Sequence, residues 1–212
     1  MRTDDLIAAL SDEPASTRSA AVMPWLGAAA AVGGLVAFLN MTAWLGLQPL
    51  DVAMRSRWFW MKGGYTLCLA GAGLVWVARL CRPGEVATYA PYVALAAVAA
   101  LAAMAGMNTL GAPPNLAASQ WLGQTWSVCS FYIVVLSAPI FVAVVWVMRR
   151  LAPTRLVLAG AVAGAFSGAV AATIYGLHCP ESTAAFVVTW YTLGIAAAGG
   201  LGAITGPRLL RW

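Results

Sequence analysis

The residues of this chain best suited to chemistry are the segment His178-Cys179-Pro180-Glu181 and a second thiol at Cys129. His178 is the only histidine, and it stands beside a cysteine. A neighbouring imidazolium favours the reactive thiolate, and a carboxylate can orient the imidazole. These residue types predict a redox-active thiol at Cys179 whose ionisation His178 and Glu181 modulate.

The same residues could instead hold a soft metal ion. Cys129, His178 and Cys179, with Glu181 in addition, offer sulfur, nitrogen and oxygen ligands for zinc or a cadmium-type ion. The adjacent His178 and Cys179 would need an irregular loop to converge on one ion, and Pro180 favours such a loop. We favour redox chemistry without a resident cofactor, and a transient metal ion at this place is the alternative.

The composition indicates which elements must position these groups. Of 212 residues, 62% are hydrophobic and 9% are charged, against about 25% charged in an average soluble domain. Because an ionised side chain at the bilayer centre is costly and a span needs about 20 apolar residues, the charge-free intervals mark the spans. They predict an all-α integral membrane protein with six transmembrane helices, at 25–45, 58–77, 91–110, 126–147, 156–177 and 184–204. Lys62, near one end of the second span, is expected to snorkel toward the interface. Gly111, Pro113, Pro114 and Asn115 are expected to form a loop between the third and fourth spans.

The basic residues predict the orientation in a bacterial cytoplasmic (inner) membrane. With both termini in the cytoplasm, nine of the 12 Lys and Arg residues flank the spans on the inside, as the positive-inside rule requires. Cys129 and Cys179 then face the oxidising periplasm, where a disulfide between them is reasonable, although Cys129 could also be an apolar filler. Cys68 and Cys81 are interpreted as core or incidental thiols.

The chain divides into an acidic cytoplasmic tail, residues 1–21, and a transmembrane sensor domain, residues 22–212. In the tail, four acidic residues outnumber Arg2 and Arg18. A short amphipathic helix capped by Thr3 could order on a partner's groove, and a disordered leader is the alternative. The residues predicted to bind the partner are Thr3, Asp4, Asp5, Leu6, Ile7 and Leu10.

Three small residues predict where two spans pack closely. Gly160, Gly164 and Gly168 share one face of the fifth span. Small residues let helix backbones approach in a bilayer, so this face is expected to contact the glycine-rich sixth span.

Several segments together resemble one known family. They are Thr3-Asp4-Asp5-Leu6-Ile7, Trp126 with Cys129, Leu177-His178-Cys179-Pro180-Glu181, Trp190-Tyr191-Thr192-Leu193-Gly194 and the ending Gly206-Pro207-Arg208-Leu209-Leu210-Arg211-Trp212. In this order they resemble the NrsF-type membrane anti-sigma factors, six-span bacterial proteins that hold an extracytoplasmic-function sigma factor inactive. The resemblance implies periplasmic cysteines at Cys129 and Cys179 and a sigma-binding cytoplasmic tail. Cys68 and Cys81 do not match the family pattern.

The expected function is therefore that of a non-enzymatic anti-sigma factor. Its partners would be the lipid bilayer and an extracytoplasmic-function sigma factor, without direct nucleic-acid contact. Release of the sigma factor would follow when Cys129 and Cys179 meet an oxidant or a thiol-reactive metal. One alternative is a small-solute transporter or channel, although the spans carry few polar groups for a path. Another is a membrane thiol oxidoreductase, although the chain has no C-x-x-C pair.

Overall fold

The computed structural model describes residues 22–82, 88–111, 113–151 and 153–211. These residues form helices and no strand. Six helical segments are long and apolar enough to cross a membrane, and each contains most of a span predicted from the charge-free intervals. The predicted partner-binding residues of the tail all lie outside the described residues.

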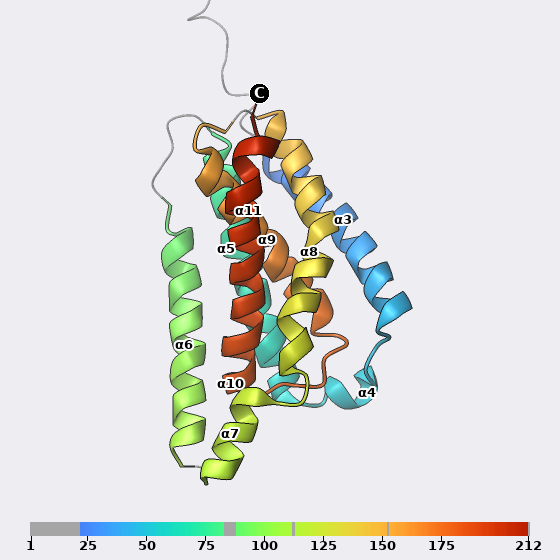
Figure 1. Ribbon diagram of the computed structural model, residues 1–212, viewed down its shortest axis with the longest axis vertical. Helices are drawn as coiled ribbons and strands as arrows, with labels where there is room; N and C mark the ends of the chain where they lie inside the picture. Colours follow the sequence, from blue (N-terminus) through green and yellow to red (C-terminus); the bar gives the residue numbers. More distant parts are fainter. Residues whose placement is uncertain (1–21, 83–87, 112, 152, 212) are drawn as a thin grey trace, which may run out of the picture.

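The chain contains long membrane-spanning helices and short helices that connect some of them. The membrane-spanning helices are α3 (Val22–Trp44), α5 (Arg57–Leu80), α6 (Ala90–Leu110), α8 (Trp126–Arg149), α9 (Leu156–Tyr175) and α11 (Thr192–Leu209). Short helices join them: α4 (Leu50–Ala53), α7 (Pro114–Leu122), α10 (Ala184–Phe186) and the π-helix η1 (Val187–Tyr191), which leads from α10 into α11. In Figure 1, α4, α7 and α10 lie at the same end of the bundle, opposite the C-terminus.

Two local expectations are corrected by the structure. The prolines after Gly111 end α6 as expected, but Pro114 begins α7 instead of continuing a loop, since proline is well tolerated in the first turn of a helix. Lys62 does not snorkel: its side chain is 2% exposed. It turns into the protein, where its ammonium group binds backbone carbonyl oxygens.

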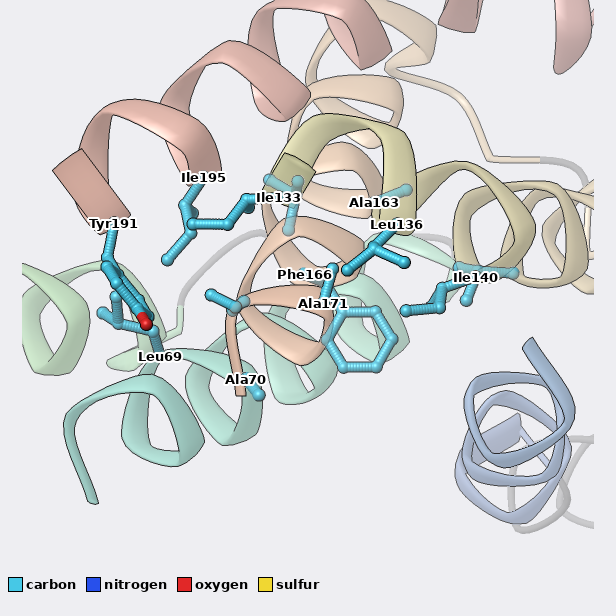
Figure 2. Packing of buried hydrophobic residues seen from close by; sticks show 14 of the residues in the cluster. Leu69, Ala70, Ile133, Leu136, Ile140, Ala163, Phe166, Ala171, Tyr191 and Ile195 are labelled. Atoms are coloured by element: carbon cyan, nitrogen blue, oxygen red, sulfur yellow. The ribbon is translucent and has the colours of Figure 1, made fainter. Parts of the chain in front are cut away.

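The centre of the bundle is α9, the most buried of the six spans. It packs against α11, α5, α8 and α3, whereas α6 stands at one edge and is the least buried. Figure 2 shows how Ile133 of α8, Phe166 of α9 and Ile195 of α11 point into a shared interior. Interiors of this kind hold their side chains by close packing, because lipid tails are as apolar as the side chains themselves.

Glycine allows the closest of these contacts. A Cβ added at Gly160 would overlap the carbonyl oxygen of Gly202 and lie 2.7 Å from Cα of Gly206. At Gly164 it would overlap the carbonyl oxygen of Ala198, and at Gly168 it would come within 3.1 Å of Cα of Ile195. The face of α9 that carries these three glycines therefore lies directly against α11, with backbone touching backbone.

Candidate functional site

Two cysteine side chains meet at the end of the bundle that carries α4, α7 and α10. Cys129 lies in the first turn of α8, and Cys179 lies in the turn between α9 and α10. Both are free thiols with no exposed surface. The thiol of Cys129 interacts with the sulfur of Cys179 as a hydrogen-bond donor, so the two side chains lie close to each other. We call these two residues the thiol pair.

The turn that carries Cys179 is fastened to the segment after α3. The backbone N–H of Gln48 donates to the carbonyl oxygen of Leu177 (3.2 Å), and its side-chain Nε2 donates to that of Gly176 (3.1 Å). Nδ1 of His178 donates to the carbonyl oxygen of Gly46 (3.0 Å). Within the turn, the N–H of Cys179 donates to the carbonyl oxygen of Tyr175 (3.0 Å), which closes the last turn of α9.

Lys62, in the second turn of α5, binds backbone carbonyl oxygens of the turn that carries Cys179. Its Nζ donates to the carbonyl oxygens of Cys179 (2.7 Å) and Glu181 (3.0 Å). The ammonium group also lies 5.8 Å from the ring centre of Tyr191 and 6.0 Å from that of Phe59. A buried charge needs such partners, because leaving water without compensation costs several kcal/mol.

Tyr191 approaches the thiol pair from η1. Its side chain is completely buried, and among the described residues its hydroxyl oxygen makes no hydrogen bond of ordinary length. The hydroxyl interacts instead with the sulfur of Cys179 at longer range, as does that of Tyr175. The π-helical turn shifts the backbone here, and Ser130 Oγ on α8 donates to the carbonyl oxygen of Trp190 (2.7 Å). Such turns often mark functional sites.

Glu181 fixes the other side of the turn through its carboxylate. Its Oε1 accepts a hydrogen bond from the backbone N–H of Gln124 (2.8 Å). Gly123 has φ +58°, and a Cβ there would lie 2.6 Å from Phe186 and 3.0 Å from the carboxylate carbon of Glu181. Thr183 Oγ1 adds a bond to the carbonyl oxygen of Gln120 (2.8 Å) and caps α10. The α7–α8 connection and the Cys179 turn are thus held together.

These surroundings make Cys179 acidic for a thiol. The hydrogen bond from Cys129 is the largest of the effects that lower the pKa of Cys179 to about 6, and burial opposes it. The ammonium of Lys62, the hydroxyl of Thr125 (3.7 Å from the sulfur) and the backbone N–H of Glu181 act in the same direction as Cys129. The lowered pKa favours the thiolate of Cys179 at neutral pH, and a thiolate close to a second thiol is the arrangement required for two-electron oxidation to a disulfide.

The other two cysteines lie elsewhere. Cys81 follows α5 and is buried, and burial raises its pKa to about 12. Cys68 is exposed on α5. A protonated thiol is a poor nucleophile, so Cys81 has none of the activation that Cys179 has.

A pocket beside the Cys179 turn does not open onto either sulfur of the thiol pair. A pocket of about 280 Å³ lies between α4, α5 and the turn, lined by Gln48, Pro49, Val52, Ala53, Ser56, Phe59, Lys62, Pro180 and Ser182. The pocket therefore reaches Lys62 and the backbone of the turn, but neither cysteine lines it. A reagent must be small, or the turn must open, before sulfur chemistry begins.

The structure shows where the side chains predicted to modulate Cys179 form their hydrogen bonds. His178 points to Gly46, and Glu181 contributes its backbone N–H to the sulfur while its carboxylate binds Gln124. Across residues 22–82, 88–111, 113–151 and 153–211, no three His, Cys, Asp or Glu side chains gather as a metal site would require. Lys62, Thr125, Tyr175 and Tyr191 were not anticipated; the one available signal was that Lys62 is the only lysine and lies inside a predicted span.

The fold and the site define a class: a multi-pass helical membrane protein with an activated thiol pair at one end of the bundle. The chain belongs to the NrsF family, described as negative regulator of sigma F, whose sequence model matches residues 10–212. The family is regulatory, which favours a regulator over the transporter and oxidoreductase alternatives.

Two curated relatives are similar over their full length. The anti-sigma-F factor NrsF of Caulobacter vibrioides is 41% identical over 214 residues, covering 100% of both chains. The probable anti-sigma-F factor NrsF of Azospira oryzae is 38% identical over 218 residues, again covering 100% of both. No solved structure shows a significant match to the chain.

Proposed function

We propose that this protein is an anti-sigma factor of the bacterial inner membrane. It holds an extracytoplasmic-function sigma factor through its N-terminal tail and releases it when Cys129 and Cys179 react with an oxidant or a thiol-reactive metal. The observation that carries the proposal is the close approach of the acidic thiol of Cys179 to the thiol of Cys129, both completely buried at one end of the bundle.

The charge of the N-terminal tail favours a sigma factor as the partner. The tail carries four acidic residues, Asp4, Asp5, Asp12 and Glu13, and a sigma factor has a basic DNA-binding surface. The carboxylates can occupy the positions that DNA phosphates would occupy, so the tail can bind that surface electrostatically. Leu6, Ile7 and Leu10 would then enter an apolar groove as the tail folds.

The two ends of the bundle differ in charge, and this difference indicates its orientation in the membrane. Arg79, Arg149, Arg155 and Arg208 flank the spans at the end that carries the C-terminus, whereas the thiol pair lies at the opposite end. The end rich in arginine is cytoplasmic by the positive-inside rule. The thiol pair would then face the periplasm, where disulfides persist.

A hydroperoxide would oxidise the thiol pair in two steps. The Cys179 thiolate attacks the outer peroxide oxygen, the O–O bond breaks, and the departing alkoxide takes the proton that Cys179 gave up, leaving a sulfenic acid. The sulfur of Cys129 then displaces hydroxide, which leaves as water with the Cys129 proton. The pair loses two electrons, the peroxide gains them, and an S–S bond joins α8 to the Cys179 turn. A thiol-reactive metal ion would bridge the same two sulfurs without oxidation.

A new bond at this place would change helix positions. Moving a population from about 1:99 to 99:1 needs about 5.5 kcal/mol of differential stability, and covalent closure of a loop typically contributes about 2–4 kcal/mol of that. Because the Cys179 turn continues into α9 on one side and α10 on the other, strain there reaches the tightly packed α9–α11 pair.

The test is sigma-dependent transcription in cells, with and without hydroperoxide, in Cys129→Ser, Cys179→Ser and the control Cys68→Ser. We expect the control to respond like the parent and both pair variants to lose the response. An unchanged response in both would remove the sensor role. Deletion of residues 1–13 should free the sigma factor without oxidant, and continued repression would refute the tail as the binding segment.

A further inference from the structure

Lys62 is the buried cation of the thiol site, and beyond its charge effect on Cys179 the oxidation steps described above assign its side chain no part. It lies within a membrane-spanning helix and is 2% exposed, and within the described part of the chain both of its hydrogen-bond acceptors are backbone carbonyls. An ionisable residue inside a span is expensive and marks a functional place by default. The placement of Lys62 therefore calls for a role that a neutral side chain would not fill.

The geometry shows what the ammonium group holds. Its two acceptors belong to Cys179 and Glu181, the residues on either side of Pro180. Pro180 has no N–H to hold the turn by itself, so Lys62 supplies the polar contacts at its centre. The same two residues present groups to the thiol chemistry: Cys179 its sulfur, and Glu181 the N–H that the sulfur accepts.

We propose that Lys62 is a positioning residue for the thiol pair: by binding the carbonyls of Cys179 and Glu181 it holds the turn so that the Cys179 sulfur faces Cys129, and its charge favours the reduced pair. The proposal deepens the proposed function and rests on it only in the claim that the pair is a sensor. A loss of about 1 Å in placement can slow a reaction about 100-fold, so the rate of disulfide closure should report the role directly.

The experiment uses the full-length protein in detergent with Cys68 and Cys81 replaced by serine, so that the thiol pair alone reacts. The oxidant is diamide. The Cys179 thiolate adds to one azo nitrogen, the Cys129 sulfur displaces that nitrogen, an S–S bond forms, and both thiol protons end on the hydrazine product. Two electrons pass from sulfur to the azo group. Closure is followed by maleimide mass-tagging after denaturation.

The variant is Lys62→Met, which keeps the unbranched stem of the side chain and removes the donors and the charge. The matched control is Thr66→Val, one turn further along the same helix. It removes the acceptor of the hydrogen bond that Thr173 donates (2.9 Å) and the bonds from Thr66 to the helix carbonyls of Lys62 and Gly63, without touching the turn. We expect closure to slow about 10-fold or more in Lys62→Met and less than about 2-fold in Thr66→Val. Parental closure in Lys62→Met, or equal slowing in both variants, would overturn the proposal.

A second measurement separates positioning from a general loss of packing. Equilibration with glutathione gives the reduction potential of the pair. Because the ammonium stabilises the negatively charged reduced pair, Lys62→Met should favour the disulfide about 10-fold at equilibrium, or about 30 mV more negative for two electrons. A loosened site would not be expected to close more slowly and yet favour the disulfide.

A third variant keeps the test decisive if Lys62→Met does not fold. Lys62→Gln retains a shorter N–H donor without charge, and it should shift rate and potential in the same directions. Parental values of both in Lys62→Gln would overturn the proposal. All these measurements use purified protein without a sigma factor, so a failed transcription test would remove the sensor role and leave the result on Lys62 standing.

Discussion

Gly160 on α9 and Gly202 on α11 face each other so closely that a Cβ at either position would overlap the backbone carbonyl of the other. No side chain separates the two helices at this point. The contact couples α9, which leads into the Cys179 turn, to α11, which ends at the terminus opposite the thiol pair.

Substitution of Gly160 should therefore weaken the bundle. We expect Gly160→Ala to destabilise the protein by about 1–3 kcal/mol, the usual range for overpacking, because the backbones of α9 and α11 must move apart. Gly200→Ala is the matched control, since a Cβ there meets nothing within 4 Å. Thermal unfolding in one detergent compares the two, and equal melting temperatures would contradict the close contact.

The reactivity of Cys179 should follow its acidity. The thiolate fraction rises as pH passes the pKa of Cys179, about 6, so alkylation should be slow near pH 5 and level off by about pH 7.5. Cys81, with a pKa of about 12, should show no plateau in that range. Iodoacetamide labelling with peptide mass mapping gives both profiles. A plateau for Cys179 only above about pH 9 would contradict its activation.

Two variants test which neighbour sets that acidity. Cys129→Ala removes the hydrogen bond that most lowers the pKa of Cys179, so the alkylation midpoint should move to higher pH. His178→Ala removes an imidazole that is bonded to Gly46, so the midpoint should stay where it is. A shift in His178→Ala as large as that in Cys129→Ala would restore the role that the sequence suggests for the imidazole.

Gly123 should be intolerant of substitution for two separable reasons. Its φ of +58° disfavours any side chain, and a Cβ would collide with the ring of Phe186. Gly46 has φ +76° but open space around it, so Gly46→Ala measures the backbone cost alone, of order 1–2 kcal/mol. Gly123→Ala should lower the melting temperature further than Gly46→Ala does, and a smaller loss would contradict the contact.

Much of the fold could be predicted from the sequence because the bilayer excludes charge. The helix that carries Cys129 begins at Trp126, as the charge-free interval suggests, and the long interval divides near Gly111. Charge-free length does not reveal which way a side chain turns inside a span, and for that reason Lys62 was expected to snorkel but is buried. The helical start at Pro114 and the π-turn of η1 depend on local packing that apolar composition does not encode.

The site was predictable only in part. Compartment and residue type suffice to single out Cys129 and Cys179, which the structure places close together. They do not identify Lys62, which reaches the sulfur region from a helix far earlier in the sequence, or Tyr191, which reaches it from η1. Nor do they show that His178 turns toward Gly46, since adjacency along the chain in an irregular turn does not imply adjacency of side chains.

The complete burial of both sulfurs bears on how such a signal would end. A disulfide formed in this interior would be sheltered from large reducing proteins as well as from large oxidants. Reduction of the disulfide by such a protein would then require the turn around Pro180 to open, so the oxidised state would persist after a brief exposure to oxidant for as long as that opening takes.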